Sequence, residues 1–131
     1  MRSFLCSKIH RATVTHAYLH YEGSLSIDVN LLKEADIAPF EEVHVWNVTR
    51  GSRLTTYAIE APAGSATICA NGAAAHLVEP GDIIIIATFE WVPSPDEAVS
   101  PTVVHVDEAN RITHKSHEIA GPATRAGHEG P

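Results

Sequence analysis

Alternating apolar and polar residues over the first half of the chain predict β-strands. The clearest pattern is a hairpin over residues 42–61, in which EEVHVWNV alternates strictly and RLTTYAIEA continues after a turn at Arg50-Gly51. Successive side chains of a strand point to opposite faces, so alternation indicates one buried face and one outward face. Looser alternation over residues 4–19 predicts a long strand, and SLSI at residues 24–27 predicts a short one.

One helix is predicted after the short strand. Asp28 is a typical N-cap residue, and Leu31, Leu32 and Ala35 follow it at helical spacing within VNLLKEADI. Three later apolar runs predict strands that turn residues separate. These runs are SATICA (residues 65–70), IIIIATFEWV (83–92) and TVVHVD (102–107). About six strands at short intervals with one helix predict a small, mainly β barrel.

Composition and charge narrow the classes of protein. With 131 residues, 44% of them apolar, the chain can form one domain with a substantial core. Aromatic residues make up only 6%, so the core must come from Ile, Val, Leu and Ala. The net charge of −7 argues against a nucleic-acid partner, which requires clustered Lys and Arg. Lys8, Arg11, Arg50 and Arg53 nevertheless allow a local cationic pocket.

The sequence also favours a cytoplasmic protein with no membrane partner. Charged residues interrupt the segment from Met1 to Leu19, and the apolar run near residues 83–87 is far too short to span a bilayer. Cys6 and Cys69 lack CxxC spacing and are better explained as small buried residues than as a disulfide in that compartment.

Familiar motifs for catalysis and metal binding are absent from the sequence. It contains no GxSxG, GxGxxG, GxxxxGK[ST] or HExxH. Of the nine histidines, His16 and His20 are four apart, but their segment is predicted as a strand rather than a helix. We therefore predict no metal site.

Two sets of polar residues share strand spacing. Lys8 and His10 are two positions apart, and Arg53, Thr55 and Tyr57 repeat this spacing on another predicted strand. If the two faces meet, a lysine, an imidazole, a guanidinium and a phenol converge. The simpler alternative is that each set forms a solvated strand face.

Gly-Ser occurs three times, at Gly23, Gly51 and Gly64. Glycine takes positive φ without steric cost and serine is common in turns, so each pair is explained by an ordinary turn. The dipeptide alone does not distinguish a turn from a chemical site, so the residues that flank each pair have to be considered.

Three blocks of the sequence resemble a known family. The blocks are SKIHRATVTHAYLHYEGSLSID, VHVWNVTRGSRLTTYAIEA and NGAAAHLVEPGDIIIIA. In this order and spacing they resemble the bacterial pyruvoyl-dependent aspartate decarboxylases, which make β-alanine for pantothenate biosynthesis. The resemblance covers about residues 1–105. It therefore includes the predicted hairpin and the first Gly-Ser pair, but not the end of the chain.

The resemblance implies a fold and an assembly. The expected fold is a mainly β, six-stranded double-psi β-barrel with one or two short helices. We expect one domain over residues 1–115, followed by a disordered tail over residues 116–131, which is rich in Gly, Pro, His and Glu. The family also implies a homotetramer with active sites between neighbouring subunits and, in some bacteria, a separate maturation-promoting protein.

The resemblance gives the first Gly-Ser pair a chemical role. Family precursors cut themselves at this bond, here Gly23-Ser24, which would leave a β fragment (1–23) and an α fragment (24–131). The Ser24 hydroxyl attacks the Gly23 carbonyl to form an ester, and β-elimination releases Gly23 as a carboxylate. The remaining dehydroalanine hydrolyses to a pyruvoyl group and ammonia. The pyruvoyl ketone then forms a Schiff base with L-aspartate and acts as the electron sink.

Further site residues are implied by position within the matching blocks. Arg53 matches the residue that binds a substrate carboxylate, a role that suits its planar, bidentate guanidinium. Lys8 and His10 match residues that line the same pocket. Tyr57 matches the proposed proton donor to the carbanion that decarboxylation leaves.

The resemblance also implies roles for Thr56 and for a turn at residues 71–74. Thr56 matches a residue that supports the cleavage intermediate and contacts substrate, although alternation places it opposite Tyr57 unless a bulge intervenes. A substrate-binding turn is matched by Asn71 and the backbone of Gly72, Ala73 and Ala74, where small side chains let peptide N–H groups approach an anion.

Two other functions remain alternatives to a self-processing decarboxylase. The chain could be an uncleaved, non-catalytic double-psi barrel that binds a ligand or a protein partner. A third alternative is a His-rich metal-binding module. The mass of the intact protein distinguishes them, because only the enzyme should consist of two fragments that join at Gly23-Ser24.

Overall fold

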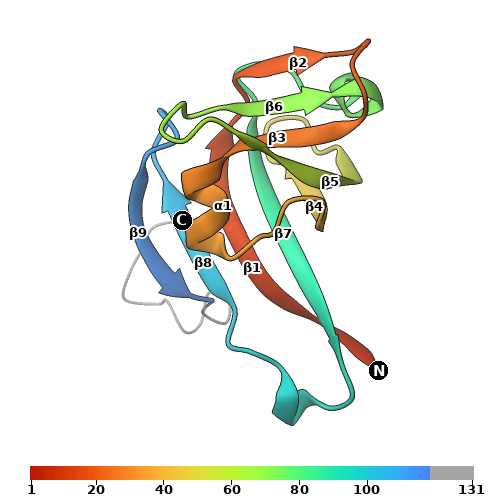
Figure 1. Cartoon of the computed structure of the whole chain (residues 1–131), viewed down its shortest axis with the longest axis vertical. Helices are drawn as coiled ribbons and strands as arrows, with labels where there is room; N and C mark the ends of the chain where they lie inside the picture. The colour runs from red at the N-terminus through yellow and green to blue at the C-terminus, as the bar shows by residue number, and fades with distance from the viewer. Residues whose placement is uncertain (119–131) are drawn as a thin grey trace.

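Nine strands joined edge to edge, in the order β2-β6-β3-β5-β4-β7-β1-β8-β9, dominate the computed structural model, which describes residues 1–118 (Figure 1). The strands are β1 (Arg2–Thr13), β2 (His16–Tyr18), β3 (Ser24–Asp28), β4 (Glu42–Asn47), β5 (Arg53–Ala61), β6 (Ile68–Asn71), β7 (Ile83–Val92), β8 (Thr102–Val106) and β9 (Ile112–His117). The described helices are α1 (Val29–Ala35) and two short 3-10 helices, η1 (Gly72–His76) and η2 (Pro95–Glu97).

The mainly β class is confirmed, but the predicted count of six strands is wrong. Within residues 1–118 no pairing joins the edge strands β2 and β9, so the nine-stranded sheet is open. The strand predicted over residues 4–19 is divided between β1 and β2. The division occurs at Thr15: the Val14 N–H still bonds to the Asp82 carbonyl just before β7, whereas the Thr15 N–H bonds to the carbonyl of Ile68, the first residue of β6.

The last strand, β9, was not predicted from the sequence. Ile112–His117 lacks apolar alternation and forms a strand by antiparallel pairing with β8. Ser116 and His117 were placed in a disordered tail, and this part of the prediction is wrong. The remainder of the predicted tail, from residue 119 onward, lies outside the described residues.

The other predicted elements are confirmed. The hairpin over residues 42–61 corresponds to β4 and β5, and the three later apolar runs correspond to β6, which extends one residue further to Asn71, β7 and β8. The helix begins as predicted, because the Asp28 carboxylate accepts a hydrogen bond from the Asn30 N–H at 2.8 Å. The same carboxylate also accepts from the N–H groups of Gly64 and Ala66, which fixes the turn before β6.

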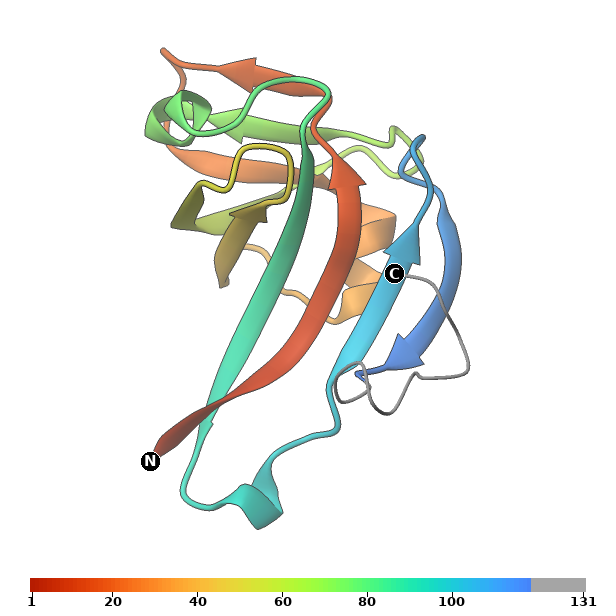
Figure 2. The same ribbon diagram turned by 180° about the vertical axis from the view of Figure 1, so that it is seen from behind.

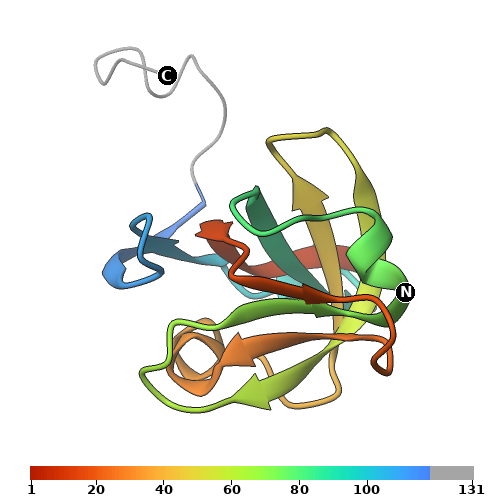
Figure 3. The same cartoon turned by 90° about the horizontal axis from the view of Figure 1, so that it is seen from above.

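Strand β5 lets the sheet wrap around a single core. Its first half pairs with β4 and its second half, Ala58–Ala61, pairs with β3. Seen from above, β2, β6 and β3 cross over the ends of the long strands β1 and β7 (Figure 3), which lie side by side in Figure 2. Aliphatic side chains from both parts fill the space between them, as the scarcity of aromatic residues predicted. They include Ile9, Leu25, Ile27, Val45, Ile68, Ile84 and Ile86.

Strand register divides the side chains between the core and the outside. The row Leu54, Val45, Ile86 and Ile9 crosses β5, β4, β7 and β1 and faces the core. The neighbouring row on the other face consists of Thr55, His44, Ala87 and Lys8. The outer face therefore carries the polar residues that the sequence had singled out on β1 and β5.

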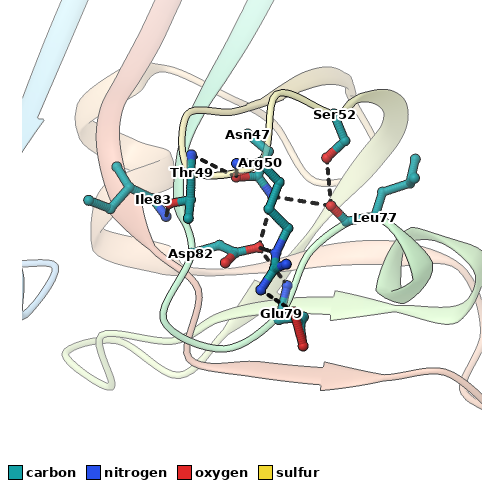
Figure 4. Close-up of polar contacts among 8 residues, drawn as sticks. All are labelled: Asn47, Thr49, Arg50, Ser52, Leu77, Glu79, Asp82 and Ile83. Atoms are coloured by element: carbon teal, nitrogen blue, oxygen red, sulfur yellow. Dashed lines mark hydrogen bonds and ion pairs between the residues drawn. The ribbon is translucent and has the colours of Figure 1, made fainter.

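A polar cluster ties the β4–β5 turn to the start of β7 (Figure 4). The buried Asp82 carboxylate accepts from Asn47 Nδ2 at 2.9 Å, from Arg50 Nε at 2.8 Å and from the Glu79 N–H at 2.9 Å. Arg50 also forms an ion pair with Glu79. Burial raises the pKa of Asp82, but the hydrogen bonds from Asn47, Glu79 and Arg50 outweigh it and lower that pKa overall. The cluster fixes the hairpin that presents β5.

Within residues 1–118, the helices are all too short or too polar to cross a membrane.

Candidate functional site

The Gly23-Ser24 bond lies where the β2–β3 loop enters the sheet. Ser24 is the first residue of β3 and pairs with Asn71, the last residue of β6. Its side chain is not free in solvent, since Ser24 is only 2% exposed and Asn71 only 1%. Asn71 Nδ2 donates a hydrogen bond to Ser24 Oγ at 2.9 Å. The predicted nucleophile and the predicted substrate-binding residue are therefore direct partners.

Gly72 brings the backbone of η1 against the Gly23-Ser24 loop. It has a φ of +65°, and a Cβ at this position would lie 2.8 Å from both Gly23 Cα and Gly23 N and 2.8 Å from the Tyr21 carbonyl oxygen. Real Cβ atoms do not come this close to backbone, so only glycine fits. Ala73 and Ala74 follow in η1, with Ala74 buried and Ala73 exposed.

Tyr57 lies on the strand beside Ser24. The parallel register pairs Leu25 with Ala58, so the residues before them, Ser24 and Tyr57, stand at the same level of neighbouring strands. Tyr57 is 38% exposed, and its ring lies 6.5 Å from that of Phe40. One chain therefore places Ser24, Asn71, Gly72 and Tyr57 around the same end of β3.

Thr56 faces the other way. The β4–β5 register runs without a shift from Glu42↔Tyr57 to Trp46↔Arg53, so the structure has no bulge that would turn Thr56 toward the side of Tyr57. Thr56 pairs with Val43, which is fully buried. The conflict with simple alternation therefore persists in this chain.

Arg53 lies at the far end of β5 in a separate groove. Its guanidinium carbon lies 5.5 Å from the centre of the Trp46 ring, which is cation–π geometry. The groove has a volume of about 500 Å³ and also includes His44, Phe89 and the 68% exposed Trp91. Tyr57 is four residue steps along the extended strand from Arg53, or about 13 Å. Arg53 of one chain is therefore remote from Ser24 of that chain.

Lys8 and His10 line a third region, a small pocket of about 160 Å³ between β1, β8 and β9. Lys8 Nζ forms an ion pair with the Glu118 carboxylate at 3.0 Å. The His10 ring lies edge-on to the ring of His105, with 5.4 Å between centres. Burial, reinforced by His105, Lys8 and Arg11, lowers the pKa of His10 and favours the neutral imidazole.

Apart from Thr56, the candidate side chains thus share the outer face without forming one site in one chain. Lys8 is three strand spacings from Thr55 along the row described above, or about 14 Å for an unbent sheet. The face-to-face convergence considered from the sequence does not occur within the single chain. Instead, the chain presents a buried Ser24 beside an exposed Gly23 in one place and cationic surfaces in two others.

Sequence reasoning missed three contacts at these places. Cys69 was explained as a core residue, but its thiol donates to Asn71 Oδ1 with a sulfur–oxygen distance of 3.2 Å. Ser26 accepts from Asn71 Nδ2 at 2.8 Å. Glu118 was counted with the tail, yet it binds Lys8. Alternation within SATICAN could have placed Cys69 on the strand face of Asn71, whereas Glu118 had no signal.

Comparison with known proteins identifies the class. Residues 1–113 match the family model described as aspartate decarboxylase, which spans most of the chain and both partners of the Ser24–Asn71 contact. The chain therefore belongs to the aspartate decarboxylase family.

Individual relatives agree with this assignment. The chain is 57% identical over 122 residues to an aspartate 1-decarboxylase of Myxococcus xanthus, covering 92% of this chain and 94% of the relative. It is 53% identical over 126 residues to one of Rhodopirellula baltica, covering 95% and 81%, and 54% identical over 125 residues to one of Legionella pneumophila, covering 95% and 94%. The chain is an enzyme, a carboxy-lyase that decarboxylates aspartate.

Proposed function

We propose that the chain cleaves itself between Gly23 and Ser24, that Ser24 becomes a covalent pyruvoyl group, and that the mature enzyme converts L-aspartate to β-alanine and carbon dioxide for pantothenate biosynthesis. The observation that carries the proposal is the buried Ser24 hydroxyl, bonded to Asn71 at 2.9 Å beside a Gly72 that no other residue can replace. An ordinary turn serine requires neither partner.

The chain's own residues can perform the cleavage. Ser24 Oγ attacks the Gly23 carbonyl carbon and its proton passes to the departing Ser24 nitrogen, which gives an ester. Loss of the Ser24 α-proton then breaks the Cβ–Oγ bond, so that Gly23 leaves as a carboxylate. Water replaces the nitrogen of residue 24 and ammonia is released. Asn71 Nδ2 lies where it can stabilise negative charge on Oγ during the attack.

The residues around Ser24 fit a small keto group. Asn71 keeps an amide donor beside residue 24 after Oγ has left with Gly23, and Gly72 keeps side chains away from the adjoining backbone. When formed, the pyruvoyl ketone supplies the electron sink that side chains lack, because it condenses with the substrate amine. We assign to Tyr57 the delivery of the proton that replaces carbon dioxide, and its position level with Ser24 on the neighbouring strand supports this role.

Substrate recognition falls to the cationic residues and the η1 turn. We assign Arg53 to one carboxylate of aspartate as a bidentate donor, with Lys8 and His10 supplying further positive charge and polarity. Asn71 and the backbone of Gly72, Ala73 and Ala74 are assigned to orient the substrate. A role for Thr56 in supporting the cleavage intermediate remains part of the proposal, although its side chain is on the core side of β5.

These roles require more than one chain. Arg53, Lys8 and His10 lie far from Ser24 on the outer face, so we propose that a neighbouring subunit of a homotetramer supplies them. The double-psi barrel also stays a proposal, supported by the parallel pairs β3–β5, β2–β6 and β1–β8. So do a cytoplasmic location and a maturation-promoting partner, which rest on the family resemblance.

Reductive trapping tests the proposal. The purified enzyme is treated with borohydride in the presence of L-aspartate, and the peptides are analysed by mass spectrometry. The substrate should become attached to residue 24, at the N-terminus of the larger fragment. Ser24→Ala should be uncut and untrapped, whereas Ser52→Ala, which alters another Gly-Ser pair, should behave as the unmodified protein. Attachment to Lys8 would show a different mechanism, and an uncut chain that only binds ligand would support the non-catalytic alternative.

A further inference from the structure

The Asn71 side chain is held by two neighbours that the proposed function does not use. Nδ2 divides its two hydrogens between Ser24 Oγ at 2.9 Å and Ser26 Oγ at 2.8 Å, while Oδ1 accepts from the Cys69 thiol at 3.2 Å. The register explains this arrangement, because Cys69 and Asn71 are alternate residues of β6 and stand opposite Ser26 and Ser24. The four side chains form one polar row on the outer face of β3 and β6.

The orientation of the Asn71 amide decides the state of the nucleophile. With Nδ2 toward Ser24, the hydroxyl accepts a hydrogen bond and its own proton remains available for transfer as Oγ attacks. If the amide were reversed, the Ser24 hydroxyl would instead donate its proton to Oδ1. That hydrogen bond would have to break before Oγ could lose the proton. Only the first orientation prepares Ser24 for attack.

Of the two neighbours, Cys69 is the one that distinguishes the orientations. The Ser26 hydroxyl can donate or accept, so it satisfies Asn71 either way. The Cys69 thiol keeps its proton, because burial raises its pKa. It therefore suits the amide oxygen, whereas sulfur is only a weak acceptor for an amide N–H. A second carbonyl oxygen, that of Ala70, lies 4.0 Å from the sulfur and competes poorly.

Burial makes this contact hard to replace. Cys69 is 5% exposed and Asn71 is 1% exposed, so water has little access to Oδ1. The alternate residues Ile68 and Ala70 are fully buried in the core, which fixes the direction in which Cys69 and Asn71 point. The thiol is consequently the donor that β6 itself supplies.

We infer that Cys69 is a positioning residue for self-cleavage, because its S–H holds the Asn71 amide with Nδ2 toward Ser24 Oγ. The inference rests on the proposed cleavage at Gly23-Ser24. No bond to Cys69 forms or breaks, and the thiol stays reduced and protonated throughout.

The test compares cleavage rates of full-length variants by intact mass over time after purification of the precursor. Cys69→Ala and Cys69→Val remove the donor, the second while filling the space, and both should slow cleavage about tenfold, the effect of one lost hydrogen bond. Cys69→Ser restores a donor and should cleave within about threefold of the unmodified chain. Cys6→Ala changes the other free thiol and should leave the rate unchanged.

Two results would overturn the inference. One is cleavage at the unmodified rate in both donor-free variants. The other is a Cys69→Ser variant as slow as Cys69→Ala with an equal fall in Tm, which would show that only the packing of sulfur matters. The unmodified chain and Cys6→Ala report on the proposed function separately. If neither is cut between Gly23 and Ser24, the proposed function fails, and the inference fails with it.

Discussion

At the Ser24 site, the absence of a side chain at Gly72 is required as well as the polar groups. Gly72 has a φ of +65°, and the backbone of residues 21–23 occupies the space a side chain would need. The neighbouring Asn71 donates a hydrogen bond to Ser24. Asn71 and Gly72 therefore hold the nucleophile and also shape the loop that is to be cut.

Gly72→Ala should abolish or strongly slow cleavage. The new Cβ would lie 2.8 Å from Gly23 Cα and N, so the Gly23-Ser24 segment would have to move away from Asn71. The left-handed φ alone costs about 1–2 kcal/mol. Gly51→Ala is the matched control, since Gly51 has a φ of +81° but open space around its Cβ. It should lose similar stability and still be cut. Rapid cleavage of Gly72→Ala, followed by intact mass, would contradict this account.

The sequence predicted only part of this residue-level arrangement. Alternation correctly placed Arg53 and Tyr57 on one strand face and Thr56 on the other, since a regular strand requires it. It could not place Asn71 beside Ser24, because that contact depends on the register between β3 and β6. Nor could it reveal Cys69, whose role as donor depends on the same register.

Among the elements, β9 lies beside a proposed binding surface, the pocket that Lys8 and His10 line. It pairs with β8 and ends next to the Lys8 and His10 pocket, where Glu118 binds Lys8 at 3.0 Å. A carboxylate of the protein thus pairs with a lysine whose positive charge the proposed function assigns to attracting the substrate. That carboxylate and the substrate should compete.

Glu118→Gln should therefore lower the KM for aspartate with kcat nearly unchanged. A partly exposed ion pair contributes up to about 1 kcal/mol, so the expected fall in KM is about two- to fivefold. The control is the steady-state kinetics of Glu34→Gln. Glu34, in α1, forms an ion pair at 3.4 Å with Lys115 of β9 and not with Lys8. An unchanged KM in Glu118→Gln would mean that the charge of Lys8 does not contribute to binding the substrate.

Strong local patterns predicted most elements, and pairing between distant segments decided the rest. The β4–β5 hairpin and α1 follow from alternation and from the Asp28 cap, both local signals. The break between β1 and β2 depends on the bond from the Thr15 N–H to Ile68, which is remote in sequence. Likewise, β9 is a strand only because β8 offers it an edge.

Over the whole molecule, the candidate residues lie in three separate places. Ser24, Asn71 and Tyr57 gather at one end of β3, while Arg53 lies with Trp46 in one groove and Lys8 with His10 in another pocket. All of them face away from the core. One chain folded around this core keeps them apart, which is why the proposed site is assembled from two chains.

Mixed oligomers should therefore recover activity from two inactive variants. Ser24→Ala cannot form the pyruvoyl group but keeps Arg53, and Arg53→Lys matures but lacks the bidentate carboxylate donor. Each alone should have very low kcat/KM. Oligomers that contain both, purified through two different affinity tags after coexpression, should regain a clear fraction of normal β-alanine formation. Activity no higher than the sum of the separate variants would place every site within one chain.

The most direct measurement is the intact mass of the purified, unmodified protein. Two fragments are expected: residues 1–23 with a free carboxylate, and residues 24–131 with a mass lower by one ammonia than that of a chain beginning with Ser24. A single uncut chain, or a larger fragment that still begins with serine and nevertheless decarboxylates aspartate, would contradict the central claim that Ser24 becomes the catalytic pyruvoyl group.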